Sequence, residues 1–190
     1  VETGEPYIIF IDTVNRMIPQ HHKLAGLTVK TSNLCSEIAE YSDAEEYACC
    51  TLASIGLPAF VVNNQFDYVA LAKCVKTIVY NLNRIIDINS YPVPETKRSN
   101  ERHRPLGIGV QGLADVYIRL KMPFDSPEAS VINKQIFATI YYAALEESHH
   151  LSTTIAQEYL YHNINLNSWD LAAFKTRIQT NRSCIGAYST

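Results

Sequence analysis

The stretch Ser126–Glu146, S-P-E-A-S-V-I-N-K-Q-I-F-A-T-I-Y-Y-A-A-L-E, contains the clearest secondary-structure signal in the chain. Ser126 is a favourable N-cap residue, Pro127 suits the first helical position, and Glu128 favours the positive end of the helix dipole. The apolar residues that follow have the spacing of one helix face: Ala129, Ile132, Ile136, Ile140, Ala144 and Leu151. This stretch therefore predicts a long amphipathic helix.

The same periodicity predicts further helices on both sides. Apolar positions step by three and four between Tyr68 and Ile86, with Asp67 as a candidate N-cap and prolines beyond the end. A shorter apolar stripe runs from Val110 to Leu120. A last short helix is expected from Asp170 to Gln179.

The start of the chain has a different character. Leu27–Ile38 carries β-branched residues without a helical stripe and is expected to be extended. Gln20–Ala25 is polar and is expected to form a loop, and Tyr41–Glu46 is expected to form an acidic turn. Cys50–Val62 is small and apolar, and glycine and proline interrupt it. We therefore expect a mostly helical α/β chain with a few extended segments near its start.

Composition excludes several function classes. The chain has 190 residues, 47% of them hydrophobic, which suits about one domain. Sixteen basic against nineteen acidic residues, and a net charge of -3, indicate no nucleic-acid-binding surface. No apolar run approaches the roughly 18 residues of a membrane span. The first residues, V-E-T-G-E-P, suggest a piece of a longer chain.

The five cysteines are sparse and lack metal-ligand spacing, so reduced intracellular thiols are expected. One of them, Cys35, lies between Asn33 and Glu37. In an extended segment this spacing places amide, thiol and carboxylate on one face. A carboxylate disfavours a thiolate, but a thiol that works as a radical needs a nearby base and a hydrogen-bonding amide rather than a low pKa. The alternative is a half-exposed strand that carries a thiol by chance.

Other motifs are better explained by packing. Gly107–Gly112, G-I-G-V-Q-G, fits a dinucleotide-binding fingerprint, but the charged E-R-H-R-P-L precedes it rather than an apolar strand. Close packing through glycine is the expected use. The adjacent histidines, His21-His22 and His149-His150, are expected at the surface or the edge of a core rather than at a metal.

Several stretches, in order, resemble the large subunit of class I ribonucleotide reductases. S-N-L-C-S-E-I at 32–38 resembles the family's catalytic loop, N-x-C-x-E. The other similar stretches are A-C-C-T-L-A-S at 48–54, N-L-N-R-I-I-D-I-N-S-Y-P-V-P-E at 81–95, R-H-R-P-L-G-I-G-V-Q-G-L-A-D at 102–115, and residues 124–146. The resemblance covers nearly the whole chain. It implies that residues 1–190 form part of the catalytic domain, a ten-stranded α/β barrel with the cysteine loop at its centre.

The resemblance also implies residue roles. Cys35 would be the transient thiyl radical that removes the 3′-hydrogen of a ribonucleotide, Glu37 would take the 3′-hydroxyl proton, and Asn33 would hydrogen-bond the ribose hydroxyls. Cys50, which precedes T-L-A-S, would be one half of the redox pair that reduces the substrate and becomes a disulfide. Cys49 is the alternative for that thiol.

Thr190 would occupy the first threonine of the family's phosphate-binding loop, P-T-A-S-T, although Ser189 stands where proline is usual. The upstream redox cysteine, the nucleotide-binding regulatory domain, the tyrosine pair that relays the radical and the C-terminal cysteine pair are expected outside this chain. So are the sites for ATP and deoxynucleotide effectors.

As partners, the resemblance implies a small subunit containing a metal, which supplies the radical, and thioredoxin or glutaredoxin as reductant. It also implies a ribonucleoside diphosphate substrate, a homodimer of the full-length protein, a cytoplasmic location and no metal in this chain. The isolated chain is expected to be inactive. Two alternatives are a cobalamin-dependent reductase and a non-catalytic relative that acts as a binding module.

Overall fold

The computed structural model describes residues 2–161, and the side chains of residues 2–154 apart from His21. The described chain divides into two compact units. Unit 1 comprises residues up to 51 together with 83–107, and unit 2 comprises residues 52–82 and the described chain from 108 onward. All three residues of the N-x-C-x-E motif, and Cys50, lie in unit 1.

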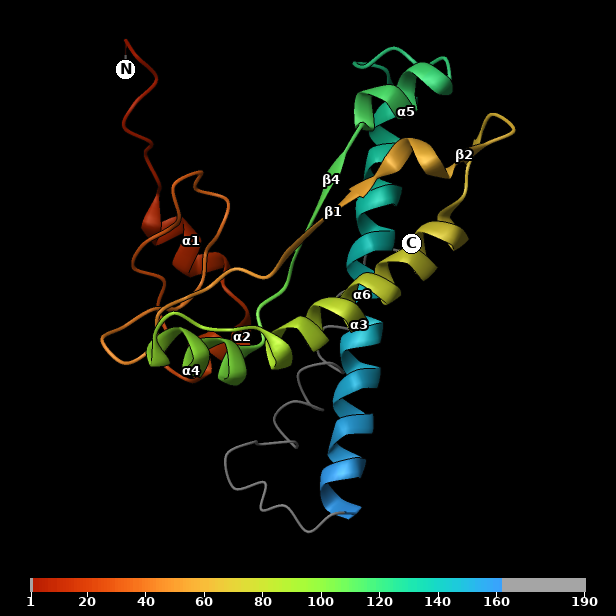
Figure 1. Cartoon of the computed structure of the whole chain (residues 1–190). Coiled ribbons are helices and arrows are strands. Elements are labelled where there is room, and N and C mark those ends of the chain that lie inside the picture. The colour runs from red at the N-terminus through yellow and green to blue at the C-terminus, as the bar shows by residue number, and fades with distance from the viewer. Residues whose placement is uncertain (1, 162–190) are drawn as a thin grey trace. The chain divides into compact units, whose positions relative to one another are not determined.

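Helices dominate the described residues, and the strands are short (Figure 1). In chain order the elements are α1 (Ile11–Met17), α2 (Gln20–Leu24), β1 (Leu52–Gly56), the 3-10 helix η1 (Leu57–Phe60), β2 (Val61–Val62), β3 (Gln65–Phe66), α3 (Tyr68–Ile88), α4 (Pro94–His103), β4 (Gly107–Gln111), α5 (Leu113–Arg119) and α6 (Pro127–Tyr161).

The two long helices begin where the sequence predicts. The backbone N–H of Ala70 donates to Asp67 Oδ1 at 2.8 Å and starts α3, and that of Ala129 donates to Ser126 Oγ at 3.1 Å and starts α6. The apolar faces of both helices supply most of the buried side chains of unit 2: Leu71, Val75, Val79 and Leu82 from α3, and Ala129, Ile136, Ile140 and Ala143 from α6. Burial of these faces, rather than helix propensity alone, accounts for their stability.

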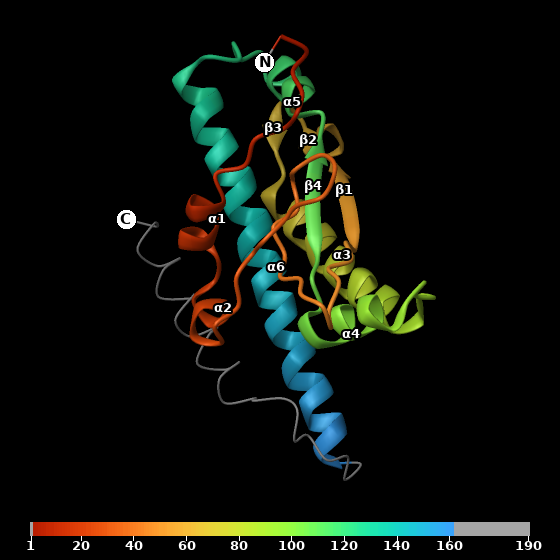
Figure 2. The same cartoon turned by 90° about the vertical axis from the view of Figure 1, so that its left-hand side faces the viewer.

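The strands form two small sheets, seen side by side in Figure 2. β1 pairs with β4, and β2 pairs antiparallel with β3, with Val61 opposite Phe66. The G-I-G-V-Q-G stretch is therefore mostly strand, and its last residue, Gly112, is the N-cap of α5. A Cβ on Gly112 would lie 2.7 Å from Pro58 in η1. This close approach supports packing as the use of Gly112, whereas a Cβ on Gly109 would meet only the Ala53 carbonyl at 3.9 Å.

The helices of the structure differ from the sequence expectations at three places. Residues 20–24 form the short helix α2 rather than a loop, with the N–H groups of His22 and Lys23 donating to the Pro19 carbonyl. The helix expected from Val110 begins at Leu113, because residues 107–111 pair with β1. Helix α4 was not expected, since its polar sequence has no apolar stripe. The helix expected from residue 170 lies outside the described residues.

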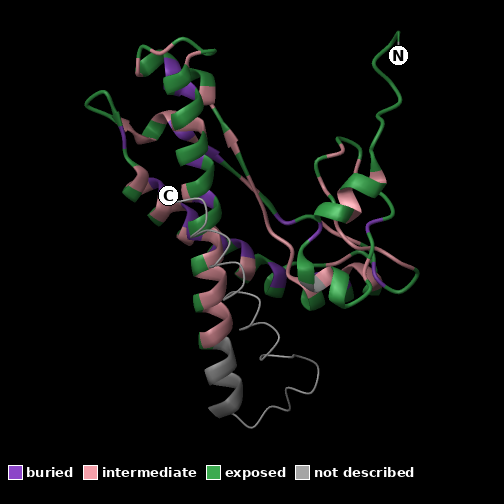
Figure 3. Ribbon diagram, turned by 180° about the vertical axis from the view of Figure 1, so that it is seen from behind, coloured by how far each residue is buried: buried purple, intermediate pink, exposed green. Residues whose placement is uncertain are grey.

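The core of unit 1 is unusually polar. Beside Ile18, Val29 and Ile86 it buries four polar side chains: Glu46, Thr51, Ser99 and Asn100. Figure 3 shows buried positions in purple. Two of the four polar side chains, Ser99 and Asn100, belong to α4. Buried polar groups require partners, so these four residues identify the part of unit 1 that hydrogen bonds must organise. Within the described residues, no helix is long and apolar enough to cross a membrane.

Candidate active site

Residues 32–38 form a closed turn with Cys35 near its tip. The N–H of Ser36 donates to the Asn33 carbonyl at 3.0 Å, and Ser36 adopts a left-handed backbone conformation with φ 65°. Two bonds close the base: Ser32 Oγ donates to the Ile38 carbonyl at 2.5 Å, and the Ile38 N–H donates to Asn33 Oδ1 at 3.1 Å. The turn therefore presents the exposed Cys35 thiol to its surroundings.

This geometry corrects the expectation of an extended segment. The alternation argument placed Asn33, Cys35 and Glu37 on one strand face, but the chain reverses between Asn33 and Ser36. Asn33 begins this turn, Cys35 lies within it and Glu37 follows it directly. The side chains of Ser32 and Asn33 hold the loop closed at its base.

The Cys50 thiol lies within electrostatic range of this loop. Burial raises the pKa of the Cys50 thiol above its usual value, and the negative charges of Glu40 and Glu37 raise it further. Glu40 is itself half-buried, and burial raises the pKa of its carboxyl group. The structure thus associates Cys50 with Glu37 from the motif and with Glu40, which sequence reasoning did not single out.

The raised pKa of the Cys50 thiol disfavours nucleophilic attack and is compatible with proton donation and oxidation to a disulfide. Near neutral pH a thiol with a raised pKa stays protonated. Because the thiolate is the nucleophilic form, Cys50 is a weak nucleophile at that pH. A protonated thiol can instead donate a proton while its sulfur is oxidised to a disulfide. The arrangement can therefore support reduction of a bound molecule, because the thiols of Cys35 and Cys50 are both exposed and Cys50 can supply reducing equivalents.

The remaining thiols are less suited to this role. Cys49 is half-buried next to Cys50, and Cys74 is half-buried within α3. Thr190, which the resemblance assigns to phosphate binding, lies outside the described residues, as does the fifth cysteine, Cys184.

The structure adds a polar cluster that the sequence did not reveal. Buried Glu46 accepts hydrogen bonds from Arg102 and from His103 Nε2, the latter at 2.7 Å. The rings of His22 and Tyr41 lie 6.1 and 5.9 Å from that of His103, centroid to centroid. His22, expected at a surface or core edge, is half-buried, and burial followed by the nearby His103 lowers its pKa. A buried acid in the acidic 41–46 turn was the available signal, but its partners are far away in sequence.

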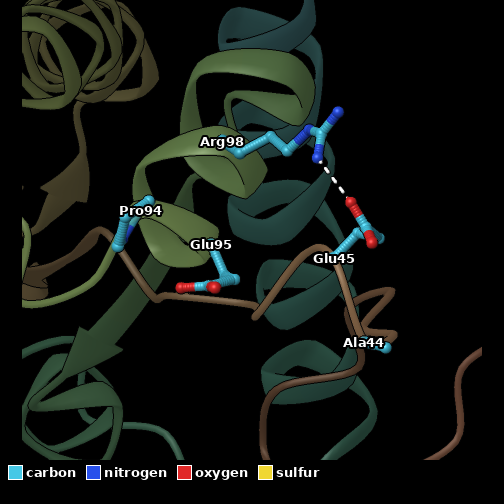
Figure 4. A pocket seen from close by; sticks show the side chains of 5 residues that line it. All are labelled: Ala44, Glu45, Pro94, Glu95 and Arg98. Atoms are coloured by element: carbon cyan, nitrogen blue, oxygen red, sulfur yellow. Dashed lines mark hydrogen bonds and ion pairs between the residues drawn. The ribbon is translucent and has the colours of Figure 1, made fainter.

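Metal ligands and cavities are few in this part of the chain. Among the described residues, no group of three or more His, Cys, Asp or Glu side chains is arranged to hold a metal ion. An open hollow of about 140 Å³ in unit 1 is lined by Ala44, Glu45, Pro94, Glu95 and Arg98 (Figure 4). None of the predicted site residues lines it.

Comparison with known proteins assigns the family. Residues 1–175 match the family model described as ribonucleotide reductase, barrel domain. The large subunit of ribonucleoside-diphosphate reductase from variola virus is 48% identical over 195 aligned residues, which cover 95% of this chain and 25% of that protein. The zebrafish (Danio rerio) large subunit is 48% identical over 193 residues, covering 93% of this chain and 24% of that protein.

A solved structure agrees with these relatives. The class Id ribonucleotide reductase alpha subunit of Actinobacillus ureae superposes with a TM-score of 0.67 at 31% sequence identity, covering 80% of this chain and 29% of that one. The chain thus spans about a quarter of the length of the curated relatives. Sequence and fold agree: this chain belongs to the ribonucleotide reductase large-subunit family, and its residues 1–175 match the barrel domain of that family.

Proposed function

We propose that the full-length protein reduces ribonucleoside diphosphates to 2′-deoxyribonucleoside diphosphates, and that unit 1 carries the reacting thiols. The main observation behind this proposal is the closed turn that carries Cys35, with Asn33 before it and Glu37 after it in the sequence. The charge of Glu37 also acts on the Cys50 thiol. The names of the relatives, ribonucleoside-diphosphate reductase large subunit, support the same reaction.

In this proposal Cys35 starts and ends each turnover. As a thiyl radical it takes the hydrogen atom from C3′ of the ribose, so an S–H bond forms as the C–H bond breaks. Glu37, which is exposed beside the turn, accepts the proton of the 3′-hydroxyl as a general base. Cys35 returns a hydrogen atom to C3′ after the substrate has been reduced, and Glu37 returns its proton.

Cys50 and a second thiol from another part of the protein supply the two electrons. The 2′-hydroxyl leaves as water with a proton from one thiol of this pair, C2′ receives the hydrogen of the other thiol in its place, and the two sulfurs become one disulfide. The raised pKa of Cys50 favours the protonated thiol that this step consumes. Each deoxynucleotide formed therefore oxidises two thiols to one disulfide. An external dithiol protein of the thioredoxin or glutaredoxin type reduces that disulfide again.

Asn33 has a divided role in this proposal. Its Oδ1 accepts the Ile38 N–H and so helps to close the turn. Its amide N–H groups are the end that can reach a ribose hydroxyl oxygen. Asn33 would thus hold both the loop and the substrate, which is why a change at this residue should affect substrate affinity as well as rate.

The proposed partners follow from the same assignment. The relatives are called large subunits, which supports a separate small subunit as the source of the radical over adenosylcobalamin. Thr190 would contribute to binding of the substrate phosphates. A cytoplasmic homodimer regulated by nucleotides bound outside this chain completes the proposal.

The test compares the full-length wild-type protein with the Cys35→Ser variant. Each is mixed with a small subunit, a ribonucleoside diphosphate, an effector nucleotide and a dithiol, and deoxynucleotide is quantified. We expect turnover from the wild type and none from the variant. Equal turnover would show that Cys35 is not the reacting thiol. Absence of turnover in two folded proteins would indicate a non-catalytic relative, and activity restored by adenosylcobalamin would contradict the two-subunit proposal.

A further inference from the structure

The segment Glu46–Thr51, which carries Cys50, is attached at both ends to α4 and the residues that follow it. Before the cysteines, the N–H of Tyr47 donates to the Glu95 carbonyl at 3.2 Å, and the carboxylate of Glu46 binds the far end of the helix. After them, the Thr51 carbonyl accepts the Gly107 N–H at 2.9 Å.

A second contact reaches Thr51 from within α4. The Asn100 amide group lies 3.5 Å from Thr51 Oγ1 and 3.4 Å from the hydroxyl of Tyr91. Tyr91 in turn donates to the Ile86 carbonyl at 2.8 Å. Asn100 is 1% exposed, so these contacts form inside unit 1 and are shielded from water.

The helix that receives these attachments is itself fixed at its end. Arg104, directly after α4, donates through Nε to Asn83 Oδ1 at 2.7 Å and pairs through Nη1 with Asp87 at 2.9 Å. Both partners belong to the last turns of α3, in the part that lies within unit 1. The cysteine segment is therefore tied to a helix that has its own anchor, so displacement of the segment requires breaking several bonds together.

Glu46 is the strongest of the attachments. Its side chain is 3% exposed, and it accepts charge-assisted hydrogen bonds from Arg102 on one oxygen and His103 on the other. Burial by itself raises the pKa of Glu46, but the hydrogen bonds and charges of His103 and Arg102 outweigh it and hold that pKa below its usual value. The carboxylate is thus ionised, buried and held on both oxygens.

We propose that Glu46 is a positioning residue for Cys50: its paired bonds to Arg102 and His103 fix the chain on which the redox thiol is placed. This inference rests on the proposed function for its catalytic consequence. A disulfide requires its two sulfur atoms to approach to about 2.05 Å, so a redox thiol on a loosely held chain reacts slowly. Misplacement of a reacting group by about 1 Å can cost about 100-fold in rate.

The neighbouring residue offers a matched control. Glu45 pairs with Arg98 at 2.8 Å across the hollow in Figure 4, and both side chains are mostly exposed. Glu45→Gln and Glu46→Gln remove the same charge from adjacent positions, but only the latter removes a buried carboxylate. An exposed ion pair contributes little, so Glu45→Gln and Arg98→Gln should behave as the wild type does.

The experiment uses the full-length protein with two readouts. The first is steady-state kcat and KM with a small subunit, substrate, effector and dithiol. The second is the rate at which iodoacetamide alkylates Cys50, followed by peptide mass spectrometry. Arg102→Gln, at a side chain that is 60% exposed, breaks the same attachment from the solvent side if Glu46→Gln does not fold. Arg102→Lys keeps the charge and should recover part of the loss.

We expect Glu46→Gln and Arg102→Gln to lower kcat by about 10- to 100-fold, with KM within about twofold, because positioning rather than substrate binding is lost. Cys50 is already exposed in the wild type. Its alkylation should become faster, since the released chain no longer holds the thiol near Glu40 and Glu37, whose charges raise its pKa. Wild-type kcat and alkylation in folded variants, or an equal effect of Glu45→Gln, would overturn the inference. If the wild type makes no deoxynucleotide but Glu46→Gln still accelerates alkylation selectively, the proposed function fails and the positioning role stands.

Discussion

Gly112→Ala should be the most damaging small substitution in the G-I-G-V-Q-G stretch. Gly112 has φ 78°, and a Cβ at this position would lie 2.7 Å from both Cγ and Cδ of Pro58. A left-handed backbone costs a non-glycine residue about 1–2 kcal/mol. Overpacking against a rigid ring costs about 1–3 kcal/mol more. The local free energy of unfolding around α5 should therefore fall by roughly 2–5 kcal/mol.

Hydrogen exchange of the α5 amides in the full-length protein measures this change directly, because exchange reports local opening. Since 1.4 kcal/mol corresponds to a factor of ten, protection should fall by roughly 30- to 4,000-fold. Gly109→Ala is the control, because its nearest neighbour, the Ala53 carbonyl, is at 3.9 Å and its backbone is not left-handed. Gly112→Ala combined with Pro58→Ala should recover the overpacking part alone.

Unchanged protection in Gly112→Ala, or equal losses at Gly112 and Gly109, would refute this reasoning. The first result would mean that η1 moves away without cost. The second would mean that both glycines serve some other purpose, such as close approach to a ligand.

Three further outcomes are expected. Glu40→Gln removes a charge that raises the pKa of Cys50, so Cys50 should be alkylated faster at pH 7.5 than in the wild type; a slower reaction would contradict the electrostatic contact. Asp67→Ala removes the bond from the Ala70 N–H and should cost about 1 kcal/mol at the start of α3, measured by hydrogen exchange there. Glu46 has a pKa below the usual value of a glutamate, so its stabilisation is present above that usual value and is lost as the pH falls through the lowered one. The difference in thermal midpoint between wild type and Glu46→Gln should shrink on acidification, and a constant difference would contradict the linkage.

The long helices were predictable because two sequence signals, the N-cap residue and the apolar spacing, indicate the same helix. In α3 and α6 the N-cap side chains and the apolar spacing agree, and the structure buries the predicted faces. Residues that satisfy local and tertiary requirements together can be recognised without knowing the partners.

Helix α4 shows why other elements could not be predicted. Its buried residues are Ser99 and Asn100, so a search for apolar periodicity passes over it. Pro94 at its first position and Glu95 in its first turn are start signals. From the sequence, the proline was interpreted only as a stop signal for the preceding helix. The tertiary contacts of its polar face, to Glu46 and Thr51, determine the helix, and these partners lie about fifty residues away in sequence.

The candidate site was predictable as a set of residues and not as a geometry. Asn33, Cys35 and Glu37 were singled out by spacing, yet the turn that groups them depends on Ser32 and on a left-handed Ser36. A non-glycine residue in this conformation carries no sequence signal, because only local hydrogen bonds hold it there.

The most direct test of the central claim is a reaction of the pre-reduced full-length protein without external dithiol. The protein is mixed with the small subunit, substrate and effector, and deoxynucleotide, lost thiols and disulfide-linked peptides are counted. The account predicts two thiols oxidised per deoxynucleotide, with Cys50 recovered in a disulfide, and neither product nor disulfide from Cys35→Ser. Deoxynucleotide formed while Cys50 stays reduced, or formed by Cys35→Ser, would contradict it.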